Sequence, residues 1–246
     1  MEVLAVTGVG EVAEGDRLGA LLAAAAPSLE DRDVVVVSHK VVSKAEGRLR
    51  SLSDVEPTDR ATGLAGALDK DPRFVQLVLD ESRSVIRADR GVLIVETGEG
   101  WICANAGIDT SNVRGHETVV LLPEDADASA RRIRREVSEE SGVSPAVVVA
   151  DSFGRAWRVG QVDIAIGCAG LEPLDDWRGR EDAVGRELEA TVVAVADEVA
   201  AAADLVRAKD GDVPAAIVRG LDAYVTAEDG PGAGPLRRAE SEDLFR

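Results

Sequence analysis

Cysteine and aromatic residues are scarce in this sequence. Of its 246 residues, two are cysteines and 3% are aromatic. Cys103 and Cys168 stand in apolar surroundings, without C-x-x-C spacing and without a histidine nearby. The sequence therefore argues against a zinc site and predicts two buried thiols.

Long apolar runs are also missing. The apolar stretches are interrupted by alanine-rich or charged segments before they reach the roughly 20 residues that a bilayer-spanning helix needs. No basic and apolar leader opens the chain. We therefore expect a cytoplasmic protein that does not associate with a membrane.

Basic residues are few compared with acidic ones. The sequence holds 28 Lys and Arg against 46 Asp and Glu, which gives a formal net charge of −18. Nucleic acids are bound through basic surfaces, so this balance argues against a nucleic-acid partner. An anionic nucleotide would also be repelled unless cations screened the surface locally.

The chain has no G-x-x-x-x-G-K-[ST] motif, so any phosphate site must be built without a P-loop. Its length allows one large domain or two small ones, and no long linker marks a boundary. We expect one domain over residues 1–246, which can be built from two intertwined subdomains. Apolar patterns predict strands over residues 1–6, 33–37, 91–96, 101–104, 118–122, 146–150, 162–168 and 214–219, and helices over residues 16–26, 58–68, 72–86, 127–140 and 184–208.

A carboxylate and a hydroxyl follow the apolar run 146–150. Asp151 and Ser152 come at the predicted end of this strand, before a turn at Gly154 and two arginines, Arg155 and Arg158. Asp offers a hard oxygen ligand for a cation, and arginine binds phosphate or carboxylate. The segment predicts a metal and phosphate site, with an ordinary surface turn as the alternative.

Residues 105–113 form a second polar cluster. It contains Asp109 among two asparagines, Thr110 and Ser111, with little that could be buried. Such residues are common in turns and helix caps, so a plain loop is one interpretation. The other is that Asp109 and Asp151 share one divalent ion.

A third cluster begins where the valine strand 33–37 ends. Residues 38–48 contain His39, Lys40 and Lys44 together with two serines. Ligands gather outside the carboxyl ends of strands in open sheets, and lysines there can neutralise phosphate oxygens. An exposed basic turn is the alternative.

Four blocks of the sequence resemble the coenzyme F420-0:L-glutamate ligase family, in the order in which that family has them. They are V-V-S-K-A-E-G-R at 41–48, A-N-A-G-I-D-T-S-N-V at 104–113, D-S-F-G-R-A-W-R-V-G at 151–160 with A-I-G-C-A-G at 165–170, and A-D-E-V-A-A-A-A-D-L-V at 196–206. The resemblance spans nearly the whole chain. It implies an α+β fold of mixed sheets with flanking helices, without a P-loop, in a homodimer.

The resemblance also implies a reaction. A member of this family adds L-glutamate to coenzyme F420-0 with GTP, giving F420-1 and then γ-linked F420-2, and uses Mg²⁺ or Mn²⁺ together with K⁺. Asp109 and Asp151 would hold one metal and Ser152 a second. The implied GTP contacts are Val9, Gly10, Glu11, Val12, His39, Lys40, Lys44, Asn112, Ala208, Lys209, Asp210, Gly211, Asp212, Val213 and Pro214.

Two other functions fit the same clusters. A metal-dependent phosphotransferase or hydrolase would use the aspartates without ligating anything. A non-catalytic protein would bind GTP without turnover. Glu46 and Asp163 are polar candidates for a general base in these blocks, and each is equally a structural partner for a nearby arginine.

Overall fold

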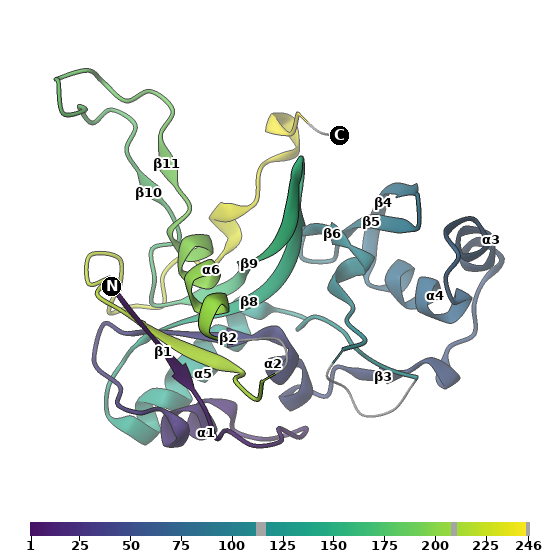
Figure 1. The fold of residues 1–246 in the computed structure, drawn as a ribbon, viewed down its shortest axis with the longest axis horizontal. Coiled ribbons are helices and arrows are strands. Elements are labelled where there is room, and N and C mark those ends of the chain that lie inside the picture. The colour runs from purple at the N-terminus through teal and green to yellow at the C-terminus, as the bar shows by residue number, and fades with distance from the viewer. Residues whose placement is uncertain (112–116, 208–210, 245–246) are drawn as a thin grey trace.

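The computed structural model of the protein describes residues 1–111, 117–207 and 211–244. Its largest sheet has five strands in the order β1-β12-β2-β8-β9 (Figure 1). Only β2 and β8 pair in parallel, and the valine runs that begin both strands are buried, as expected for strands covered on both faces. The strands are β1 (Glu2–Val6), β2 (Val34–Ser38), β8 (Ala146–Arg155), β9 (Arg158–Ala169) and β12 (Ala215–Arg219).

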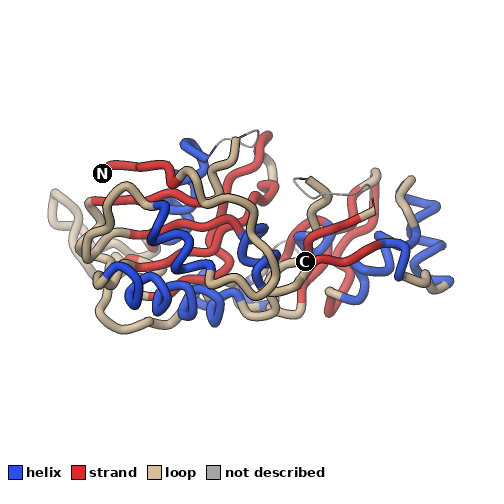
Figure 2. Tube along the Cα trace, turned by 90° about the horizontal axis from the view of Figure 1, so that it is seen from below, coloured by secondary structure: helices blue, strands red, loops and turns tan. Residues whose placement is uncertain are grey.

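Helices cover both faces of this sheet. Helices α1 (Leu18–Ala25) and α5 (Ala126–Ser141) pack together on one face, and α6 (Val195–Arg207) lies on the other. Figure 2 shows the helices lying along the layer of strands. The space between α5 and β9 is so narrow that a Cβ atom at Gly167 would come within 2.3 Å of the Ala126 carbonyl.

A second hydrophobic core lies beside the first. It joins side chains of α3 (Asp59–Leu68) and α4 (Pro72–Asp80) to two small sheets. The smaller sheet pairs β3 (Leu49–Ser51) with β7 (Thr118–Val120), and the larger has β4 (Ser82–Asp89), β5 (Val92–Thr97) and β6 (Ile102–Ala104). The expected α+β architecture of mixed sheets and flanking helices is confirmed, whereas the division into subdomains stays a prediction.

The segment after the valine strand is a helix rather than a basic turn. Helix α2 (His39–Ala45) begins directly after β2, and the Ser38 hydroxyl accepts a hydrogen bond from the Lys40 amide. Short 3-10 turns occupy Leu52–Asp54, Asn105–Gly107, Gly234–Leu236 and Glu240–Glu242.

The helix expected over residues 184–208 was wrong in its first half. That half belongs to an arm that extends from the body of the molecule and carries β10 (Asp175–Asp176) and β11 (Val192–Val193) (Figure 1). Val184 lies in this arm with 77% of its surface exposed, in a turn held by the Asp182 carboxylate. The spacing of apolar residues in the arm continues the spacing in α6, which is why the sequence pattern predicted a single long helix.

Two further boundaries differ from the prediction by five residues or more. The helix expected over 72–86 ends at Asp80, because the residues that follow pair with β5 as strand β4. The strand expected to end at Ala150 continues to Arg155, because β9 pairs with it through that point. The turn therefore lies at residues 156–157, with Trp157 in a left-handed conformation, and not at Gly154.

Both cysteines are buried, as predicted. In the described ranges, no helix combines the length and the apolar character needed to cross a bilayer.

The close approach of α5 to β9 predicts that Gly167→Ala destabilises the protein. The added methyl group meets the Ala126 backbone, which cannot move without shifting α5, so we expect a loss of about 1–3 kcal/mol in the free energy of unfolding. Urea denaturation measures it. Gly63→Ala in α3 is the control, because no atom lies within 4 Å of its added Cβ, and it should stabilise by about 0.5–1 kcal/mol. Equal unfolding midpoints for the two variants would contradict the prediction.

Candidate active site

The three predicted polar clusters come together at the start of α2. The Lys40 ammonium lies 2.8 Å from Asp109 Oδ2, and His39 Nε2 lies 3.2 Å from Asp151 Oδ1. Two consecutive residues of one helix thus contact two aspartates that are distant in sequence. Both aspartates lie beside the same helix terminus, and their sharing of one ion stays a prediction.

Asp109 is held by several donors. Lys40 also donates to the Ser111 hydroxyl, and the Ser111 amide donates to Asp109 Oδ1 at 2.6 Å. Burial acts to raise the pKa of Asp109, but the Lys40 and Ser111 hydrogen bonds outweigh it, and the pKa is lowered. The carboxylate is therefore charged at neutral pH.

The backbone that leads to Asp109 is unusual. Asn105, Ala106 and Gly107 all have positive φ angles, a conformation that costs energy at the two residues that carry side chains. The main chain of Asp109 then pairs with Val120. A Cβ atom at Gly107 would lie 2.7 Å from the Leu122 side chain, so a glycine is required there.

Asp151 and Ser152 point to opposite faces of the sheet because they are neighbours in β8. Asp151 meets His39 of α2, and its Oδ1 also accepts the Ser152 amide at 2.7 Å. The Ser152 hydroxyl donates to Asp163 Oδ1 at 2.5 Å, and Asp163 in turn pairs with Arg207 of α6. Ser152 is thus positioned by a buried ion pair.

The oxygen atoms of these side chains are suitable ligands for a hard divalent cation. Asp109 and Asp151 supply carboxylates, and the Ser152 hydroxyl keeps lone pairs after it has donated its proton to Asp163. Within the part of the chain that the structure describes, no group of three or more His, Cys, Asp or Glu side chains is arranged to hold a metal. Mg²⁺ is often bound by one or two carboxylates together with substrate phosphates, which matches this donor set.

The predicted nucleotide loop packs against α2. Lys44 Nζ lies 3.6 Å from a carboxylate oxygen of Glu11. Val9 and Val12 are buried in the main core, whereas Gly10 and Glu11 are exposed. A ligand at this loop would therefore meet backbone atoms and Glu11 rather than the two valines.

The last predicted nucleotide segment also reaches the start of α2. The Pro214 carbonyl accepts a hydrogen bond from the Ser38 amide at 2.9 Å. Gly211 and Asp212 are exposed, and Val213 and Pro214 are half-buried. Asn112, Ala208, Lys209 and Asp210 lie outside the described residues, so their predicted roles stay predictions.

Sequence reasoning missed Arg207. It is the last residue of α6, is only 7% exposed and pairs with Asp163. Both candidate general bases have structural partners: Asp163 binds Arg207, and Glu46 accepts hydrogen bonds from Ser129 and Arg132. A charged residue between Val162 and Ile164, in an otherwise apolar strand, was the available signal for a buried ion pair.

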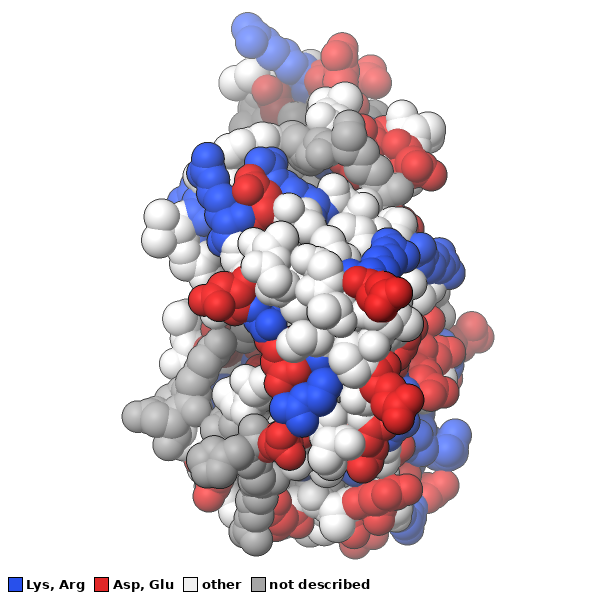
Figure 3. All heavy atoms as spheres, turned by 90° about the vertical axis from the view of Figure 1, so that its right-hand side faces the viewer, with Lys and Arg blue, Asp and Glu red and all other residues white. Residues whose placement is uncertain are grey.

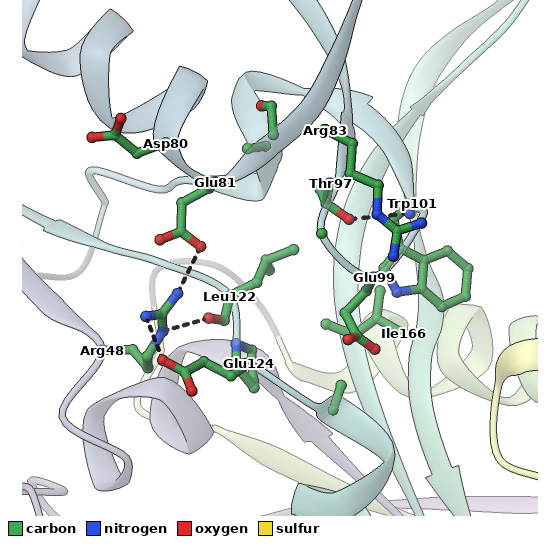
Figure 4. A pocket seen from close by; sticks show the side chains of 15 residues that line it. Arg48, Asp80, Glu81, Arg83, Thr97, Glu99, Trp101, Leu122, Glu124 and Ile166 are labelled. Carbon is green, nitrogen blue, oxygen red and sulfur yellow. Dashed lines mark hydrogen bonds and ion pairs between the residues drawn. The ribbon is translucent and has the colours of Figure 1, made fainter.

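A pocket of about 420 Å³ lies between the two cores and contains none of the predicted site residues (Figure 4). Arg48 lines one side of the pocket and donates hydrogen bonds to Glu81, Glu124 and the Leu122 carbonyl. Trp101 lines the other side. Arg48 is thus already paired with two carboxylates and a carbonyl group at this pocket.

Charges of both signs are mixed on the surface. In Figure 3, basic side chains alternate with acidic ones, and uncharged side chains fill the middle of that face. No continuous basic surface is visible there. The basic groups at the start of α2 belong to a protein with a formal net charge of −18.

Comparisons with known proteins agree on one family. Residues 8–220 match the sequence profile of F420-0:Gamma-glutamyl ligase. The chain is 47% identical to a Coenzyme F420:L-glutamate ligase of Haloarcula marismortui, over 100% of this chain and 96% of the relative. It is 44% identical to the protein of that name in Methanopyrus kandleri (96% and 94%) and 43% identical to that in Archaeoglobus fulgidus (100% and 96%).

The contact with Lys40 predicts how Asp109 titrates. Lys40→Met removes the ammonium that lowers the pKa of Asp109, so this carboxyl should titrate at a higher pH than in the wild type. In the wild type, the lowered pKa of Asp109 stabilises the folded protein at pH values above 3.8, the pKa of this carboxyl in the unfolded chain. This stabilisation is lost as the pH falls through the pKa of Asp109 in the folded protein. Carboxyl-detected NMR measures the titration.

Lys44→Met is the matched control, since Lys44 lies on the same helix and pairs with Glu11 instead. It should leave the Asp109 titration in place. An unchanged Asp109 pKa in Lys40→Met would show that the ion pair is not formed in solution.

Proposed function

The chain belongs to the F420-0:gamma-glutamyl ligase family, and from this membership we propose that it is a GTP-dependent ligase that joins L-glutamate to coenzyme F420-0. Its products would be F420-1 and then γ-linked F420-2, with GDP and phosphate released. The reaction belongs to coenzyme F420 biosynthesis.

The chemistry requires an activated carboxyl group. A carboxylate is a poor electrophile, so its oxygen first attacks the γ-phosphorus of GTP, and GDP leaves. The amine of glutamate then attacks the acyl carbon of the resulting acyl phosphate, and phosphate leaves as the amide forms. The protein has to position the anionic partners and neutralise their charge.

The arrangement at the start of α2 carries the proposal. There, Lys40 and His39 of one helix contact Asp109 and Asp151, so basic and acidic groups alternate within a few ångströms. Lys40 and Lys44 would bind phosphate oxygens, and the segment from Gly211 to Pro214 would border the nucleotide. An acidic chain without a P-loop needs such local cations to accept GTP.

Cofactors belong to the same proposal. Asp109 and Asp151 would hold Mg²⁺ or Mn²⁺, and Ser152 would contribute to a second ion. When bound, the metal supplies positive charge that neutralises phosphate oxygens. The proposed use of K⁺ is based on the family resemblance alone.

We also propose that the protein is a homodimer. The arm that carries β10 and β11 exposes Trp177, Val184 and Val192, and a second copy could cover this apolar surface. Sedimentation would test the state of assembly.

The proposal predicts that Asp109→Ala and Asp151→Ala each abolish ligation while the fold is kept. Either change removes a carboxylate from the pair that would bind the metal. Incubation with GTP, Mn²⁺, F420-0 and glutamate, followed by mass spectrometry, counts the glutamyl units added. Thermal unfolding checks the fold.

Asp89→Ala is the control, because Asp89 pairs with Arg87 at the exposed end of β4 and should leave ligation unchanged. Ligation at a near wild-type rate in either site variant would defeat the assignment. Phosphate release that needs no glutamate would favour a hydrolase, and GTP binding without turnover would favour a non-catalytic protein.

Removal of the metal gives a separate prediction. A chelator should abolish ligation, and added Mn²⁺ or Mg²⁺ should restore it. Without a cation, the negative charges of the two aspartates and of the nucleotide phosphates would repel each other. The measurement is glutamate incorporation after dialysis. Full activity in metal-free buffer would contradict the role given to the aspartates.

A further inference from the structure

Four residues carry the buried side-chain atoms that lack a hydrogen-bond partner in the described part of the structure. They are both ring nitrogens of His39, Ser43 Oγ, Asn105 Oδ1, and Nε and Nη1 of Arg207. Although His39 lies 3.2 Å from Asp151, the two do not have the geometry of a hydrogen bond. Unpaired buried polar atoms are rare in folded proteins, so each of them points to a missing partner.

These atoms come from α2, the 105–107 turn and α6, and two of the residues that carry them, His39 and Arg207, interact with Asp151. His39 contacts the carboxylate directly, and Ser43 lies one helical turn further along the same face of α2. The negative charge of Asp151 acts on Arg207 and on Cys103, two residues before Asn105. The missing partner therefore belongs to the candidate active site.

Arg207 has the strongest need for such a partner. Burial lowers the pKa of its guanidinium to about 10, and the charge of Asp151 acts against this, so the group stays protonated at neutral pH. Only Nη2 is used, in the ion pair with Asp163. A buried cation with free N–H groups is costly unless an acceptor is supplied.

We propose that Arg207 is a substrate-binding residue whose Nε and Nη1 groups donate to an oxyanion beside Ser152. The oxyanion is carried either by the transferred phosphoryl group or by the carboxylate that accepts it. Both are anionic oxygens, which arginine binds well. The inference rests on the proposed ligase function, to which it adds a residue.

A purely structural role is the competing explanation. In that case Arg207 only neutralises Asp163, which holds the Ser152 hydroxyl. Asp163→Asn separates the two roles, because the amide oxygen can still accept from Ser152 while Arg207 keeps all its donors. Under the structural explanation, loss of either member of the pair has the same effect.

Steady-state kinetics provides the main test. Arg207→Gln should lower kcat/KM at least about tenfold, the factor expected when a hydrogen bond to a charged group is lost, and should lower it more than Asp163→Asn does. A rise confined to the KM for GTP assigns the oxyanion to the phosphoryl group. A rise confined to the KM for F420-0 assigns it to the carboxylate.

Arg134→Gln is the matched control. Arg134 of α5 is an equally buried arginine, and it pairs with Asp229 and with the carbonyl groups of Pro145 and Thr226. Its loss should reduce stability without changing either KM. Equal effects of Arg207→Gln and Asp163→Asn, or near wild-type kinetics in Arg207→Gln, would overturn the proposal.

A binding measurement keeps the inference separate from the ligase assignment. Inorganic phosphate in the millimolar range should raise the Tm of the wild type and of Arg134→Gln but not of Arg207→Gln. This outcome does not require ligation, so it can hold even if the ligase assignment fails. Equal phosphate shifts in all three proteins would overturn the oxyanion site. Should Arg207→Gln not fold, Arg207→Lys, which keeps the charge but loses donors, takes its place in both measurements.

Discussion

The parallel pairing of β2 with β8 is the constraint on which the candidate site depends. Its register sets Ser38 against Ala150, so the residues that follow, His39 at the start of α2 and Asp151 within β8, lie side by side. The valines buried on both strands hold this pairing between the helices that cover the two faces of the sheet. Since Ser38 also begins α2, the same register brings the helix terminus and Lys40 to the aspartates.

Charge in the site is balanced locally rather than across the protein. Asp109 is neutralised by Lys40 and Asp163 by Arg207, while Asp151 contacts His39 and acts on the charge of Arg207 without a complete ion pair. Buried charges of this kind seldom add stability, because desolvation offsets their attraction. A site that binds anionic substrates can nevertheless use such buried charges. Hydrogen-bond donors that are already in position need little reorganisation when the negatively charged substrate binds.

The sequence predicted the strands of the main sheet and the three polar clusters, because buried runs and groups of ligand-type residues are local patterns. It could not predict that Asp151 and Ser152 lie inside β8, because that depends on the length of β9. Arg207 was missed for a similar reason: its importance comes from Asp163, 44 residues away in the sequence. The arm was mistaken for helix because apolar spacing alone does not distinguish an exposed hairpin from an amphipathic helix.

The two cores meet at this site, and each supplies one aspartate. Asp151 is part of the main sheet, whereas Asp109 follows the 105–107 turn, and Ala106 and Ile108 of this segment pack in the second core. The ion pair between Lys40 and Asp109 therefore joins the cores directly. The 105–107 turn, with three successive positive φ angles and no space beside Gly107, sets the direction in which the chain reaches Asp109. The backbone of this turn and the Lys40 ion pair together place Asp109 beside the main sheet, although the segment that leads to Asp109 packs in the second core.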